Sequence, residues 1–304
     1  MSEIAVKKRR NRIGDPAGDR VLKVVVVTLV TLLTLTCVLP LLNIFATSLS
    51  SAKAITSNKV VFWPIDLSTD AYKTVFTSGP LMKSMSFSIM ITIIQVLFSV
   101  TMTVLIAYPL SESTLVGRKP LWMFVLFTMY FSGGMIPMYL LLKNMSLLNT
   151  MWCLILPGLI STYNMILMRT YFCSIPGALK EAALIDGAND ATVLARVILP
   201  LSKSMLATIA LFYGVSRWNA VQDGMIYITD PNKYILQVRL SNIIMSSSAM
   251  NELISEGSST NNVILQSEQI RSASLCFSII PVMVVYPFLQ KYFVKGVMIG
   301  SVKG

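Results

Sequence analysis

The segment 174–200 combines charged, small and turn-forming residues at spacings that could carry a specific chemical role. Pro176 suits the first turn of a helix, and Gly187 is placed to end that helix in the left-handed conformation. Asn189 or Asp190 can then cap a second helix. Apolar and small side chains recur at three- and four-residue steps, at Leu179, Ala182, Ala183 and Ile185. The pattern predicts a short surface helix that another protein can approach closely. The chemical role expected for this segment is therefore binding of a protein.

Catalytic chemistry of the common kinds is not expected in this chain. The sequence has no histidine, which excludes histidine acid–base catalysis, histidine-dependent triads and histidine metal sites. It also has no Walker A phosphate-binding loop. The four cysteines have no CxxC spacing, and most lie in apolar runs that favour small buried side chains. We therefore expect no catalytic residue, no metal site and no cofactor in this chain.

The elements that must position this loop are apolar. Hydrophobic residues make up 54% of the 304 residues and charged residues only 13%, and the mean hydropathy is +0.68. A helix needs about 20 apolar residues to cross a bilayer. Five charge-free segments qualify, at 24–52, 84–111, 120–142, 144–168 and 272–290. A shorter additional segment, the fifth in chain order, covers about 205–221 with Arg217 near one end. The sequence predicts an all-α, polytopic membrane protein with six transmembrane helices.

The distribution of basic residues predicts the orientation. With a cytoplasmic amino terminus, 16 of the 25 Lys and Arg residues fall in inside segments, so both termini are expected in the cytoplasm. The first apolar run is too long for a cleaved signal peptide. The basic start, Lys7 to Arg12, could bind nucleic acid, but an anchor on anionic lipid explains it better.

These observations divide the chain into three parts. Residues 1–23 form a basic cytoplasmic tail, 24–295 a six-span transmembrane domain, and 296–304 a second cytoplasmic tail. Within the domain, the inside loop covers about 174–200 and an outer polar loop about 222–271. The outer loop contains the polar stretch 246–262, which we expect to be irregular and flexible.

The inside loop resembles the EAA loop of binding-protein-dependent ABC importer permeases. That pattern is E-A-A-x3-G-x9-I-x-L-P, and the chain departs from it only in Val197, which replaces isoleucine. The resemblance implies the type I ABC importer fold, in which this loop forms a coupling helix that docks into a groove of the cytoplasmic ATPase. It implies that Glu181 and Asp186 are polar anchors, while Ala182, Ala183 and Gly187 allow close packing.

Other stretches resemble the carbohydrate permeases of the maltose type. These are Asp186-Gly187-Ala188, the Trp218-Asn219 pair, the segment 136–152 and the terminal segment 290–304. The segment 136–152 is similar to the branch that imports complex oligosaccharides such as alginate- or pectin-derived fragments. The resemblance implies a bacterial inner-membrane heterodimer with a second permease subunit, a cytoplasmic ATPase dimer that holds ATP and Mg, an extracytoplasmic solute-binding protein and an oligosaccharide substrate.

Candidates for the sugar path combine aromatic rings with amide or hydroxyl groups at membrane depth. They are Tyr163 and Asn164 in the fourth span, and Tyr213, Trp218 and Asn219 in the fifth. Tyr and Trp also collect at membrane interfaces, and Trp218 beside Arg217 fits that role as well.

Three alternatives stay open on the residues. The chain could be an ABC permease for a non-sugar solute, against which only the resemblance argues. An ion-coupled secondary transporter usually has ionisable residues or broken helices at the midplane, and the five long spans contain no charged residue. An integral-membrane enzyme would need clustered carboxylates or histidine, which the spans do not have.

Overall fold

The computed structural model describes residues 17–255 and 268–287, and in these ranges the chain forms helices and no strand. The all-α prediction is confirmed for the described residues. In chain order the elements are α1 (Ala17–Ser48), α2 (Ala52–Thr56), α3 (Asp70–Thr77), α4 (Gly79–Ser111), α5 (Arg118–Tyr130), α6 (Met135–Asn144), α7 (Trp152–Ile155), η1 (Leu156–Gly158), α8 (Thr162–Ser174), α9 (Gly177–Ile185), α10 (Asp190–Val193), η2 (Leu194–Ile198), α11 (Leu199–Leu201), α12 (Lys203–Trp218), α13 (Val221–Tyr227), η3 (Pro231–Lys233), α14 (Leu236–Ser255) and the helix Glu268–Pro287.

Several helices of the described chain are long enough to cross a membrane. By length and composition, three described helices can cross a bilayer: Val21–Ser48, Gly79–Ser111 and Glu268–Pro287. Two bent pairs raise the number to five if each pair is one span. Helix α8 has 13 residues and packs among these helices. The chain is therefore a multi-pass membrane protein.

Two of the expected spans are interrupted. A single helix over 120–142 is wrong, because α5 ends at Tyr130 and α6 begins at Met135 at an angle of 109°. Gly134 in this bend has a φ of 85°, which glycine adopts without steric cost. The expected span 144–168 is also broken, because Pro157 and Gly158 lie in η1 before α8 begins. Average hydropathy does not register either break, since the intervening residues are apolar or small.

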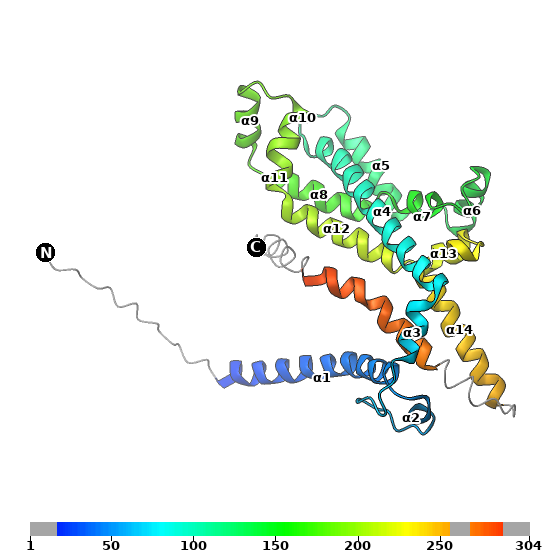
Figure 1. Cartoon of the computed structure of the whole chain (residues 1–304). Coiled ribbons are helices and arrows are strands. Elements are labelled where there is room, and N and C mark those ends of the chain that lie inside the picture. Colours follow the sequence, from blue (N-terminus) through cyan, green and yellow to red (C-terminus); the bar gives the residue numbers. More distant parts are fainter. Residues whose placement is uncertain (1–16, 256–267, 288–304) are drawn as a thin grey trace.

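Helix α4 is the centre of the packing. It runs alongside α8 and α12 (Figure 1), and these two pairs form the most extensive helix contacts in the described chain. Buried polar side chains line one face of α4 at steps of four or seven residues: Ser84, Ser88, Gln95, Ser99 and Thr103. Small and polar residues of this kind let membrane helices approach closely and hydrogen-bond across the interface.

Helix α1 has an apolar surface on all sides. Its membrane-length part has no buried residue over the most hydrophobic window, and Figure 1 shows its amino-terminal part projecting away from the other helices. The helix starts before the expected residue 24, at Ala17, and ends at Ser48. A surface of valine and leucine on every side is suited to hydrocarbon or to another apolar helix.

The expected outer loop is largely helical where the structure describes it. Helices α13 and α14 and the turn η3 occupy most of the segment 221–255, so the expectation of an irregular stretch is wrong for residues 246–255. Asn149 ties this region to the turn before α7, because its Oδ1 accepts hydrogen bonds from the backbone of Thr229 at 2.7 Å and Asp230 at 3.1 Å. The rest of the polar stretch, 256–262, lies outside the described residues, as does the terminal segment 290–304.

Candidate functional site

The loop singled out in the sequence forms helix α9 at one end of the helical body (Figure 1). No residue of α9 is buried, and Glu181 and Ala182 are exposed. Ile185 is 86% exposed and Leu184 is 50% exposed, so two large apolar side chains lie next to each other on the surface at the end of this helix. Ala183 faces the other way and packs against the core around α4, α8 and α12. The helix therefore presents one exposed face that contains both polar and apolar side chains and that is open to contact by a partner.

The end of α9 is built as the sequence predicts. Gly187 has a φ of 83°, and it donates a hydrogen bond to Leu184 O at 3.0 Å. Ala188 donates to Ala183 O, also at 3.0 Å, which completes the pair of bonds of a Schellman motif. Asn189 then caps α10 by accepting from Thr192 N at 2.8 Å. A side chain at Gly187 would meet no atom within 4 Å, so backbone conformation and not space requires glycine there.

Two basic residues hold α9 and its neighbours to the helices behind them. Lys180 forms an ion pair with Glu112, the residue that ends α4, and its Nζ lies 5.4 Å from the centre of the Tyr108 ring. Arg169 on α8 donates to Leu110 O at 2.9 Å and stacks over Trp122. The Lys180 contacts therefore join α9 to the end of α4, and the Arg169 contacts join α8 to α4 and α5.

After α9 the chain changes direction before it enters the helical body. The segment α10–η2–α11 includes a π-helical stretch at Leu194–Ile198, and it meets α12 at 82°. Ser202 at the bend donates its hydroxyl to Ile198 O at 2.7 Å. Single-turn π segments recur at functional sites, and this one lies between the surface helix and a core helix.

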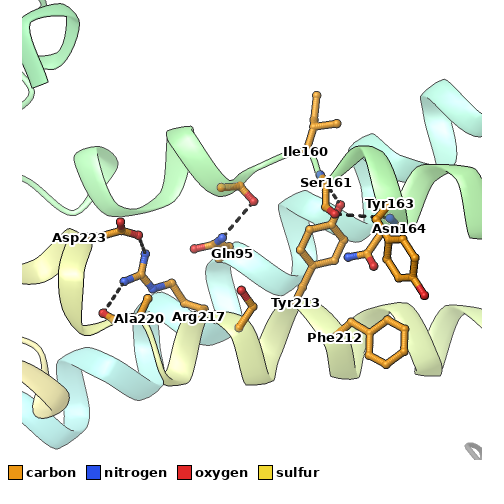
Figure 2. Close-up of a pocket in the computed structure, with 12 residues that line it drawn as sticks. Gln95, Ile160, Ser161, Tyr163, Asn164, Phe212, Tyr213, Arg217, Ala220 and Asp223 are labelled. Carbon is orange, nitrogen blue, oxygen red and sulfur yellow. Dashed lines mark hydrogen bonds and ion pairs between the residues drawn. The ribbon is translucent and has the colours of Figure 1, made fainter. Parts of the chain in front are cut away.

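A cavity of about 390 Å³ lies between α4, the start of α8 and α12 (Figure 2). Tyr163 is 54% exposed and Asn164 is buried, so the wall offers an aromatic ring beside an amide. The lining residues are Gln95, Gly158, Ile160, Ser161, Tyr163, Asn164, Phe212, Tyr213, Ser216, Arg217, Ala220 and Asp223. Eight of these twelve residues have polar or charged side chains and three of the twelve are aromatic, a combination suited to a small polar ligand.

The structure brings together three of the five candidate path residues. Tyr163, Asn164 and Tyr213 line the cavity, although the Tyr213 hydroxyl is already bonded to Thr103 and Ser161. Trp218 and Asn219 do not line it. Trp218 packs against a separate cluster near α3 and α14. Asn219 ends α12 and donates back to Val215 O at 2.9 Å.

Known proteins with the same organisation support the resemblance found in the sequence. No family model matches the chain. The polygalacturonan/rhamnogalacturonan transport system permease protein YtcP of Bacillus subtilis (strain 168) is 39% identical over 94% of this chain and 99% of its own length. Protein LplC of the same strain is 39% identical over 88% of this chain and 90% of its length. A solved chain of a bacterial ABC transporter for import of the acidic polysaccharide alginate is 34% identical, with a TM-score of 0.82, over 91% of this chain and 98% of that one.

The chain belongs to the permease subunits of oligosaccharide ABC importers. This confirms the predicted family and fold class. The relatives are transport permeases and not enzymes, so neither a membrane enzyme nor an ion-coupled secondary transporter is supported. In this permease subunit, α9 contains Glu181-Ala182-Ala183, where the segment that resembles the EAA loop in sequence begins, and the cavity lies deeper in the helical body.

Sequence reasoning missed several polar residues of the cavity. Gln95 was not singled out, although it is an amide in an otherwise apolar helix and lies four residues before Ser99 on the same face. The sequence places Arg217 only near one end of a span, whereas in the structure it is 5% exposed and forms an ion pair with Asp223 at 3.3 Å. Since burying an unpaired charge is costly, an arginine next to a predicted span could have indicated a partner within reach.

Proposed function

We propose that this permease subunit imports oligosaccharides and is driven by an ATPase that docks on α9. The observation that carries the proposal is the exposed face of α9, where Glu181, Ala182, Asp186 and Gly187 stand at EAA-loop spacing in a chain of this family. Ala183 packs inward and joins this face to the core. ATP and Mg would be held by the partner, since the chain offers no phosphate-binding loop of its own.

The cargo proposed is an oligosaccharide from an acidic polysaccharide. Two similar proteins support this class, one named for polygalacturonan/rhamnogalacturonan transport and one for import of the acidic polysaccharide alginate. In this chain the cavity offers Tyr163 for stacking and Asn164 for hydroxyl groups. Arg217 is less available for a sugar carboxylate, because it already bonds Leu154 O, Ala220 O and Asp223.

The assembly proposed contains four kinds of component. A second permease subunit completes the path, an ATPase dimer docks on the cytoplasmic side, and a solute-binding protein delivers cargo on the opposite side. The charge distribution supports an orientation with α9 and both termini in the cytoplasm of a bacterium. The exposed apolar surface of α1 supports a neighbour or lipid around this helix.

Charge reversal at Glu181 tests the docking role of α9. We expect Glu181→Lys to lower ATP-driven uptake in the assembled transporter about tenfold. A reversed charge at a desolvated contact lowers the binding free energy more than a neutralised charge does. Uptake of radiolabelled oligosaccharide into proteoliposomes measures the effect, together with ATPase activity and co-purification of the ATPase.

The matched control is Glu181→Gln, which keeps the size of the side chain and removes only the charge. A smaller loss of uptake is expected for this variant. Normal uptake in Glu181→Lys, with the complex intact, would rule out the proposed role of this face.

Truncation of Tyr163 tests the cavity as the sugar path. We expect Tyr163→Ala to lower the maximal uptake rate about fivefold while ATPase activity persists, because a stacking contact of roughly 1 kcal/mol is lost. The control is Tyr130→Ala, since Tyr130 is a more exposed tyrosine, at 78%, and does not line the cavity. Equal effects of the two substitutions would show that the cavity has no special part in transport.

A further inference from the structure

The backbone between α7 and α8 is interrupted inside the helical body. Helix α7 has four residues, η1 has three, and the chain then turns through Leu159 and Ile160 before Ser161 caps α8. Such a break leaves carbonyl and amide groups without helical partners. At membrane depth these groups need partners from neighbouring helices.

Three buried side chains supply those partners, and Figure 2 shows how Gln95, Tyr213 and Arg217 lie along the cavity. Gln95 on α4 donates from Nε2 to Gly158 O at 3.1 Å. Arg217 on α12 donates from Nη1 to Leu154 O at 2.6 Å. Tyr213, one turn before Arg217 on the same face of α12, accepts at its hydroxyl from Ser161 N at 2.9 Å. Each of these residues is at most 5% exposed. Gln95 and Arg217 offer donors to carbonyl groups, and Tyr213 offers an acceptor to an amide.

Tyr213 also connects the break to α4. Its hydroxyl lies 2.8 Å from Thr103 Oγ1, so one phenol joins α4, α12 and the first residue before α8. The bonds therefore tie the backbone from Leu154 to Ser161, which leads into α8, to α4 and α12. They lie along the wall of the cavity, which the same backbone segment helps to form.

The order of the helices along the chain connects α9 to the cavity through α8 and α12. Helix α9 follows directly after α8, and the segment that follows α9 leads through the bend at Ser202 into α12. A movement of α9 is thus applied to the far ends of α8 and α12. Without cross-links at the cavity, the short helix α8 could tilt independently of α12.

We propose that Gln95, Tyr213 and Arg217 are positioning residues that make α8 move as one body with α4 and α12, so that movement of α9 reaches the cavity wall. This rests on the proposed docking of the ATPase on α9. The cross-links would then act as part of a rigid-body switch. None of the three needs to contact the sugar for this role.

Gly158 provides a probe of one cross-link. A Cβ at this position would lie 2.8 Å from Gln95 Nε2, so Gly158→Ala displaces the Gln95 amide from its acceptor. Gln95→Leu removes the same donor from the other side. Both substitutions act on one hydrogen bond, and their effects should therefore not multiply.

The experiment measures sugar imported per ATP hydrolysed by the complete transporter in proteoliposomes. We expect Gln95→Leu and Gly158→Ala each to lower this ratio about tenfold, because each leaves a buried carbonyl unpaired. The double variant should be no worse than the poorer single variant. Tyr213→Phe, which removes only a hydroxyl group, should lower the same ratio, while Thr101→Val on the exposed side of α4 should leave it unchanged.

Each other outcome has a definite meaning. Parallel loss of uptake and ATPase activity, with an unchanged ratio, would overturn the positioning role and indicate a general loss of folding. Multiplying effects of Gln95→Leu and Gly158→Ala would overturn it as well. If Glu181→Lys uncouples the transporter but the cross-link variants do not, this inference fails while the docking proposal stands; normal coupling in Glu181→Lys contradicts the docking proposal itself.

Discussion

Valine in place of Gly187 is expected to abolish most sugar uptake while the permease still folds and assembles. Gly187 holds a φ of 83° between α9 and α10, and a side chain there would meet no other atom. The left-handed conformation costs a residue other than glycine about 1–3 kcal/mol. For a β-branched residue such as valine, the cost lies at the upper end of this range. About 3 kcal/mol corresponds to roughly a 100-fold lower population of the native turn. Uptake in proteoliposomes and retention of the ATPase on the purified permease measure the loss.

Asparagine at the same position separates backbone strain from loss of a close contact. Asn tolerates the left-handed conformation better than other residues with a side chain, so Gly187→Asn should retain much of the uptake if strain dominates. If Asn and Val abolish uptake equally while the turn is intact, the side chain itself collides with the docked partner. Normal uptake in Gly187→Val would contradict a role for the geometry of this turn.

The turn between α9 and α10 could be predicted from the sequence because its signals are local. Helix capping at Asn189 and termination at Gly187 depend on residues within a few positions of each other. The structure has both features where the sequence places them. The approximate places of the long apolar helices were also predictable, since lipid requires long hydrophobic runs, whereas six uninterrupted spans were not found in the described residues.

The breaks in the spans could not be predicted in the same way. Gly134 and Pro157 lie in runs that are apolar enough for a continuous helix, and whether the backbone breaks depends on which neighbours can satisfy it. Gln95 is such a neighbour, 63 positions before Gly158 in the chain. The contact is invisible to any local pattern. Arg217 lines the cavity because it lies four residues after Tyr213 on the same face of α12, whereas Trp218 lies on a different face and packs elsewhere.

Loss of the Asp223 carboxylate is expected to destabilise the permease strongly. The side chain of Arg217 is 3% exposed, and Asp223 is the acidic group that pairs with it, at 3.3 Å. Breaking a buried ion pair costs about 3–5 kcal/mol, because one charge remains in a poorly solvated site. Asp223 itself is 44% exposed, so we expect Asp223→Leu to lie near the lower limit, about 3 kcal/mol. Thermal unfolding of the purified transporter in detergent should show a midpoint lower by several degrees.

Two comparisons make this prediction specific to the buried charge. Asp223→Asn keeps an oxygen that can accept from Nη1 and loses only the charge, so its midpoint should lie between those of the natural chain and Asp223→Leu. Asp70→Asn removes the charge from the pair Asp70–Lys73, whose side chains are 76% and 72% exposed, and exposed pairs contribute little to stability. Its midpoint should not change measurably. No measurable shift for Asp223→Leu would contradict the prediction, and would mean that the bond of Arg217 to Leu154 O, and not its pairing with Asp223, keeps Arg217 in the cavity wall.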